Sequence, residues 1–105
     1  MQRTRSLLRT LICLIGLIPA FNVFAGDPMQ GASIYTQQCA GCHGGNGIGI
    51  IAGTPNLAGN TQLMVKPDFE LMNTILLGKG IMPAFQGKLT ELQVLDVIAH
   101  IRTFF

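Results

Sequence analysis

The chain has little charge and no long stretch of one sign. Only 11% of its 105 residues are charged, with seven Lys and Arg against five Asp and Glu. Three of the basic residues are Arg3, Arg5 and Arg9, so residues 26–105 carry a formal charge of −1. A surface that binds nucleic acid needs a basic stripe, and residues 26–105 do not have one. The length allows one small domain.

Long apolar runs are also lacking. The run over residues 11–18 falls short of the ~20 residues that span a bilayer, and Pro19 and Asn22 interrupt its continuation. Arginines precede it and a small-residue motif ending at Ala25 follows it, which is typical of a secretory signal peptide. We therefore predict a signal peptide over residues 1–25, periplasmic export, and no stable membrane insertion after cleavage. An uncleaved membrane anchor is the weaker alternative.

Cysteine is scarce as well. Cys13 lies inside the apolar run, without the small residues expected before a lipidated cysteine. We therefore expect it to be removed with the signal peptide. A tetrahedral zinc site needs four ligands. Residues 26–105 could offer only Cys39, Cys42, His43 and His100, and the adjacent Cys42 and His43 would fit one small tetrahedron poorly. The cysteine content therefore argues against zinc.

The two remaining cysteines belong to the motif Cys39-Ala40-Gly41-Cys42-His43. This spacing is the attachment signature of c-type haem. Two thiols add across the two vinyl groups of the haem, and the following histidine can supply a nitrogen ligand to the iron. A thioredoxin-type site would lie in a βαβ pattern, and no strand-rich run flanks the motif. A structural disulfide would leave His43 without a role.

Three helices are predicted over residues 26–105. The first begins at Asp27-Pro28, with Gln30 completing a capping box, and runs into the haem motif. The second begins near Pro67 and ends before Gly78. Its expected apolar face is Met72, Ile75 and Leu76.

The third helix begins at the capping box of Thr90 and Gln93. Its expected apolar stripe is Val94, Val97, Ile98, Ile101 and Phe105. Residues 44–62 are too rich in glycine for a helix and are expected to form an irregular loop over one haem face.

Haem iron has a second axial position, for which Met82 is the favoured ligand. Glycines precede Met82 and let the backbone approach the porphyrin, while Pro83 stiffens the loop after it. A thioether ligand raises the reduction potential. Met64, expected in a loop, stays open as an alternative. Met72 and His100 are interpreted as packing residues, and Met29 as a residue that either packs locally or is exposed.

The chain resembles a small bacterial class I cytochrome c over residues 27–105. The Cys39–His43 motif follows a short helix, Pro55 and Leu57 match the Pro-x-Leu of the family, and Met82-Pro83 matches its methionine ligand. The resemblance implies an all-α cytochrome c fold, with three main helices and loops wrapped around one covalently bound haem c. It also implies that the Pro55 carbonyl accepts a hydrogen bond from the other nitrogen of His43.

In the family, a glycine and an aromatic residue make the crossing of the first and last helices. Gly31 and Tyr35 stand at those positions, whereas the last helix carries His100 where many relatives have an aromatic residue.

The resemblance implies a monomeric, periplasmic carrier of single electrons between a donor and an acceptor redox protein, rather than an enzyme. Two alternatives stay open. One is a gas- or peroxide-binding haem protein with a labile Met82 ligand, and the other is a haem subunit of a larger oxidoreductase. Lys79 and Lys88 flank the Met82 loop and fit either partner docking or a solvated face.

Overall fold

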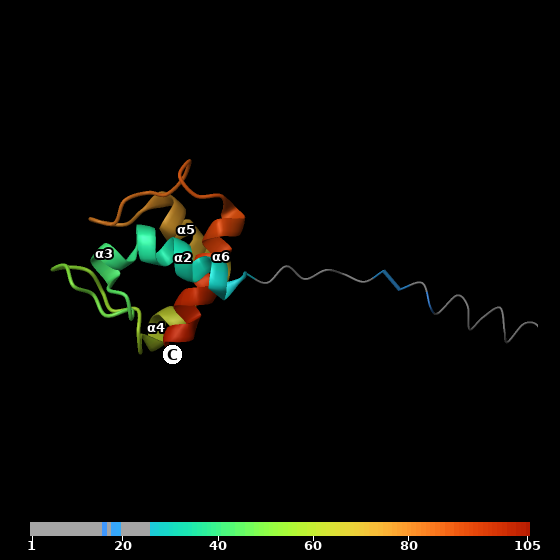
Figure 1. The fold of residues 1–105 in the computed structure, drawn as a ribbon, viewed down its shortest axis with the longest axis horizontal. Helices are drawn as coiled ribbons and strands as arrows, with labels where there is room; N and C mark the ends of the chain where they lie inside the picture. Colours follow the sequence, from blue (N-terminus) through green and yellow to red (C-terminus); the bar gives the residue numbers. More distant parts are fainter. Residues whose placement is uncertain (1–15, 17, 20–25) are drawn as a thin grey trace, which may run out of the picture.

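The computed structural model describes residues 16, 18, 19 and 26–105 (Figure 1). Cys13 and the predicted cleavage after Ala25 involve residues outside the described ones. The elements are α2 (Pro28–Gln38), α3 (Ala40–His43), α4 (Thr61–Met64), α5 (Asp68–Leu77), α6 (Glu91–Ile101) and the 3₁₀ turn η1 (Arg102–Phe104). The described part of the chain contains no strand, only two isolated bridges. It also holds no helix that is long and apolar enough to cross a membrane.

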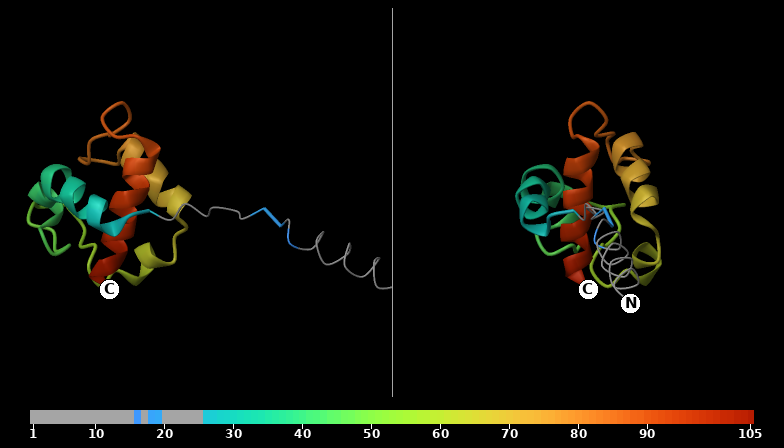
Figure 2. Two further views of the ribbon diagram at one scale, coloured as in Figure 1. Left: turned by 45° about the vertical axis from the view of Figure 1, so that its right-hand side comes forward. Right: turned by 90° about the vertical axis from the view of Figure 1, so that its right-hand side faces the viewer.

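The three long helices α2, α5 and α6 confirm the predicted all-α architecture. Helix α6 lies between the other two, with α2 on one side and α5 on the other (Figure 2). Its buried positions are Val94, Val97, Ile98 and Ile101. They serve two clusters because successive apolar residues on a helix point in different directions. Val94 and Ile98 pack with α5 and Phe85, whereas Val97 and Ile101 pack with Tyr35 and Leu57.

The crossing of α2 over α6 requires a glycine. A Cβ atom on Gly31 would overlap the backbone carbonyl of Asp96 in α6. One turn later, Tyr35 is buried against Val97 and Ile101. The expected contact of the first and last helices through a glycine and an aromatic residue is therefore confirmed.

Helix α2 begins as predicted, but not through a full capping box. The Asp27 side chain accepts hydrogen bonds from the backbone N–H of Met29 (2.9 Å) and Gln30 (3.4 Å). The backbone N–H of Asp27 donates instead to Oδ1 of Asp96, at 2.7 Å. Asp96 of the neighbouring helix thus takes the place of Gln30 as the acceptor for the Asp27 N–H, and this hydrogen bond joins the start of α2 to α6.

Several boundaries differ from the prediction. Helix α2 ends at Gln38, and Cys39, whose backbone is not helical, separates it from α3. The irregular loop ends at Asn60, because the Asn60 side chain caps α4 by accepting from the N–H of Leu63. Met64 therefore ends a helical turn rather than lying in a loop.

The apolar faces of two helices differ in part from the prediction. On α5 the expected Met72, Ile75 and Leu76 all pack in the core cluster, and Leu71 is buried beside them. Phe105 is 47% exposed. Helix α6 ends at Ile101, and the tighter 3₁₀ turn shifts the i+4 position out of the core. Phe104 packs against the core in its place. The capping box of Thr90 and Gln93 is confirmed.

Candidate haem-binding site

The Cys39–His43 motif forms one helical turn at the end of α2. The N–H groups of Cys42 and His43 both donate to the Cys39 carbonyl, at 3.2 and 3.0 Å. Residues three and four apart on a helix share a face. The turn therefore gathers the two thiols and the imidazole on one side of the backbone, as attachment to the edge and iron of a single porphyrin requires.

Both thiols are free, so the disulfide alternative does not apply. Cys39 is half-buried, and its burial, with a smaller contribution from Cys42, raises its pKa to about 11. Cys42 is exposed. Among the residues that the structure describes, no group of three His, Cys, Asp or Glu side chains is placed to hold a metal ion.

His43 is half-buried, and burial lowers the pKa of its imidazole. The backbone of Pro55 acts as a weak hydrogen-bonding partner and opposes that shift. The contact is not a well-formed bond, because Nδ1 of His43 is buried without a partner at ordinary hydrogen-bond geometry. A buried polar atom without a partner is uncommon. An imidazole whose Nδ1 is enclosed beside Pro55 fits a haem ligand that offers its other ring nitrogen, Nε2.

The loop after His43 is held by its own backbone. The N–H of Ile50 returns to the Cys42 carbonyl at 2.9 Å. The N–H of Gly49 donates to the Asn56 side chain at 2.8 Å, next to Pro55. No role was predicted for Asn56, and its place between Pro55 and Leu57 is the only sequence signal that marks it. These bonds bring the Pro55 segment back towards the turn that carries His43.

Met82 follows a tight turn that is closed by two hydrogen bonds. The N–H of Met82 donates to the Lys79 carbonyl (3.0 Å), and the N–H of Lys79 donates to the Met82 carbonyl (3.2 Å). Gly78 precedes the turn with φ +76°, and a Cβ atom there would lie 2.7 Å from the Met82 carbonyl oxygen. The partly buried Met82 packs against the cluster around Phe85. The thioether is therefore held by a rigid turn.

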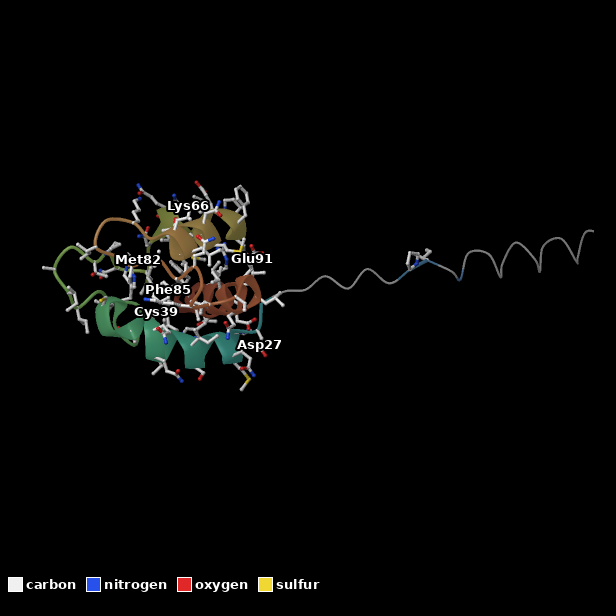
Figure 3. The ribbon with its side chains drawn as sticks, turned by 90° about the horizontal axis from the view of Figure 1, so that it is seen from above. Asp27, Cys39, Lys66, Met82, Phe85 and Glu91 are labelled. Atoms are coloured by element: carbon white, nitrogen blue, oxygen red, sulfur yellow. The ribbon has the colours of Figure 1, made fainter. Side chains whose placement is uncertain are left out.

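The two loops meet at the end of the domain that carries the cysteines. A Cβ atom on Gly53 would lie 3.7 Å from Cδ1 of Ile81, the neighbour of Met82. Figure 3 places Cys39 and Met82 at the same end of the domain, away from Asp27 and Glu91. The turn that carries the two thiols and the imidazole and the turn that carries the thioether thus lie at one end of the domain, although they come from two parts of the chain. This donor set suits a covalently attached haem.

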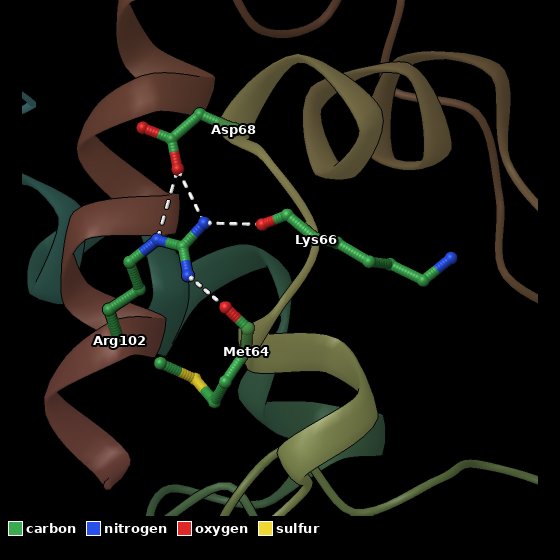
Figure 4. A network of polar contacts seen from close by, with 4 residues as sticks. All are labelled: Met64, Lys66, Asp68 and Arg102. Carbon is green, nitrogen blue, oxygen red and sulfur yellow. Dashed lines mark hydrogen bonds and ion pairs between the residues drawn. The ribbon is translucent and has the colours of Figure 1, made fainter.

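Met64 lies in a different setting from Met82. Its carbonyl accepts from Nη1 of Arg102 at 3.2 Å, next to the bonds from Arg102 to the Lys66 carbonyl and Asp68 (Figure 4). Arg102 thereby ties the segment before α5 to the end of α6. Arg102 is the one arginine of residues 26–105, and no sequence motif marks it.

His100 packs against two aromatic rings. Its ring centroid lies 5.1 Å from that of Tyr35 and 5.0 Å from that of Phe104. Burial lowers the pKa of His100. The interpretation of His100 as a packing residue is confirmed, and together with Phe104 it packs against Tyr35 where α2 crosses α6.

Similarity to known proteins agrees with this site. The family model described as cytochrome C oxidase, cbb3-type, subunit III matches residues 26–101. Cytochrome c6 of Thermosynechococcus vestitus is 34% identical over 89 residues, which cover 84% of this chain and 78% of that protein. The cbb3-type cytochrome c oxidase subunit FixP of a Bradyrhizobium strain is 36% identical over 78 residues, which cover 70% of this chain and 27% of that subunit.

A solved structure shows the same fold. Cytochrome c6 from the diatom Phaeodactylum tricornutum superposes with a TM-score of 0.63 at 24% identity, covering 76% of this chain and 100% of the other. The family match includes both the Cys39–His43 turn and the Met82 turn. The chain therefore belongs to the small class I c-type cytochromes: it has the cytochrome c fold, binds one haem c covalently and acts as a monohaem electron carrier.

Proposed function

We propose that Cys39 and Cys42 hold the haem as thioethers and that His43 and Met82 are its two axial ligands. The observation that carries this proposal is the convergence of the Cys39–His43 turn and the pinned Met82 turn at one end of the domain. When bound, the haem supplies the one-electron couple of its iron. The protein residues set the potential of that couple and limit access to it.

His43 and Met82 have different tasks in this proposal. His43 binds through Nε2, and the Pro55 backbone beside Nδ1 orients the ring and increases its basicity. Met82 contributes a soft thioether, which favours ferrous iron and raises the potential. With both axial positions filled, no position is left for a substrate, so we infer an electron carrier that is not an enzyme.

Replacing Met82 tests the ligand assignment. Met82→Leu keeps most of the side-chain volume and the packing against Phe85, but removes the sulfur. We expect loss of the weak long-wavelength absorbance band of the ferric protein, a lower midpoint potential and ready binding of imidazole.

Met64→Leu is the matched control and should preserve the band and the potential. If Met64→Leu removes the band while Met82→Leu keeps it, the distal ligand is Met64. If neither variant changes the spectrum, the gas- or peroxide-binding alternative becomes the better one.

We further propose that residues 1–25 are a signal peptide and that the protein works in the periplasm as a monomer. The basic start, the apolar run over residues 11–18 and the small residues before Gly26 support this. The intact mass of haem-loaded protein purified from periplasm should correspond to residues 26–105 plus one haem. A mass that retains Arg3 to Arg9 would contradict the cleavage.

The partners in this proposal are a donor and an acceptor redox protein. Lys79 is exposed on the Met82 turn, and Lys88 lies 5.9 Å from the centre of the Phe85 ring, so both are placed to contribute charge to docking. The similarity to FixP favours one further candidate, a haem subunit of a larger oxidoreductase. Co-purification from native cells at constant stoichiometry would support the subunit, and a free protein of monomer size would support the diffusing carrier.

A further inference from the structure

Tyr35 makes a hydrogen bond that its packing role does not require. Its hydroxyl donates to the backbone carbonyl of Gly44, at 2.6 Å, and this pair is buried. Gly44 directly follows His43 and ends α3 with a φ of 77°. A phenylalanine would fill the same core position without this bond. The hydroxyl therefore connects α2 to the residue next to the proposed iron ligand.

The Tyr35 ring has little freedom to move its hydroxyl elsewhere. Only 1% of Tyr35 is exposed. The His100 ring lies 5.1 Å from it and the Phe104 ring 5.3 Å, both in tilted or edge-on arrangements. Such aromatic contacts restrict the ring directionally. Residues of α6 and η1 thus hold the donor that reaches Gly44.

The same carbonyl begins a short series of backbone bonds. The Gly44 carbonyl also accepts from the N–H of Gly47, at 3.2 Å, and the Gly47 carbonyl accepts from Leu57 (2.7 Å) and Ala58 (3.0 Å). Gly47 sits close against Phe104, since a Cβ atom on it would lie 2.8 Å from that ring. The Tyr35 hydroxyl therefore supports both the turn of His43 and the segment that leads back to Pro55.

We propose that Tyr35 is a positioning residue for His43. Its hydroxyl fixes the backbone conformation at Gly44 and in the segment that leads to Pro55, on either side of the contact between the His43 imidazole and Pro55. This contact in turn influences the basicity of the imidazole. The inference rests on the proposed role of His43 as the proximal iron ligand. In a buried setting, where a hydrogen bond is stronger than in water, removing this hydroxyl leaves the Gly44 carbonyl with Gly47 as its remaining partner.

The test compares two variants of the holoprotein that each remove one hydroxyl from α2. Tyr35→Phe removes the bond to Gly44. Thr36→Val removes the neighbouring hydroxyl, which bonds only to the Ala32 carbonyl within the same helix, at 2.8 Å. The readouts are the midpoint potential, the NMR signals of the His43 ring, and amide hydrogen exchange at Gly47 and Leu57.

We expect Tyr35→Phe to raise the midpoint potential, because a less firmly held imidazole donates less charge to iron. The His43 ring signals should shift, and exchange at Gly47 and Leu57 should accelerate by about fivefold to tenfold, as for loss of one hydrogen bond. Thr36→Val should leave all three readouts at their wild-type values. A Tyr35→Phe protein with a lower melting temperature but unchanged potential and ring signals would overturn the inference.

A second measurement serves if Tyr35→Phe fails to retain haem. Tyr35 is the only tyrosine of the chain, so a fluorotyrosine with fluorine beside the hydroxyl replaces it alone. This more acidic phenol is a stronger donor, and the potential should move downwards; no shift would count against the inference. A wild-type protein whose spectrum shows no histidine ligand to the haem iron would overturn the proposed function and this inference together. If the wild-type spectrum is as expected but changes at Tyr35 leave the midpoint potential and the His43 ring signals unaltered, this inference alone is overturned.

Discussion

At the scale of single residues, we expect His100 to make the helix crossing sensitive to acid. Burial lowers its pKa from the ordinary value of 6.5, so the folded state favours the neutral ring. A group of this kind contributes stability above its unfolded pKa, and the contribution is lost as pH falls through the folded pKa. We predict that His100→Phe, which keeps an aromatic ring between Tyr35 and Phe104, reduces the loss of stability below about pH 6.5.

Denaturant unfolding of the holoprotein across this pH range checks the His100 prediction. His43 shares the direction of the shift, but as a proposed iron ligand it is present in both proteins and cancels in the comparison. If wild type and His100→Phe lose stability in parallel below neutral pH, protonation of His100 does not contribute to acid unfolding.

At the scale of the helices, the contact of α2 with α6 depends on the missing side chain of Gly31. Alanine is favoured over glycine inside a helix by about 1 kcal/mol. At Gly31, however, its Cβ would overlap the backbone carbonyl of Asp96, and such overpacking costs about 1–3 kcal/mol or more. The overlap is with backbone rather than a flexible side chain, so we expect Gly31→Ala to lower the free energy of unfolding.

Gly45→Ala is the matched control for the helix crossing, because a Cβ atom there meets nothing within 4 Å. Thermal unfolding should distinguish the two variants, with Gly45→Ala close to wild type. Equal melting temperatures for Gly31→Ala and wild type would mean that the helices can shift apart at little cost.

At the scale of the whole molecule, stability should depend on the attached haem. A domain of about this size buries a modest core on its own, and its apolar residues form two small clusters on either side of α6. We predict that Cys42→Ala, expressed with the haem attachment machinery, yields little cooperatively folded protein.

Met82→Leu separates attachment from ligation in that experiment, because it keeps both thioethers and should remain folded. Circular dichroism during heating compares the two variants. A Cys42→Ala protein without haem that melts in one sharp transition would show that the helices suffice for the fold.

Local signals account for the parts of this protein that the sequence predicted well. The capping box of Thr90 and Gln93, Pro67 and Gly78 act within one turn of the chain, so the limits of α5 and α6 were readable. The haem motif was readable for the same reason, since its spacing is a property of five consecutive residues. The start of α4 was missed because the Asn60 cap is a single residue in a glycine-rich stretch.

The sequence by itself determined the haem-attachment motif, the three long helices and the turn of glycines and proline around Met82. Each of these features depends on residues that are neighbours in the chain. Only the tertiary structure decided which long-range partners these elements find. Asp96 replaces Gln30 as partner of the Asp27 amide, Phe104 replaces Phe105 in the core, and the Tyr35 hydroxyl reaches the residue after His43. Such contacts depend on how α2 crosses α6. Local sequence patterns do not predict which residues far apart in the chain come into contact.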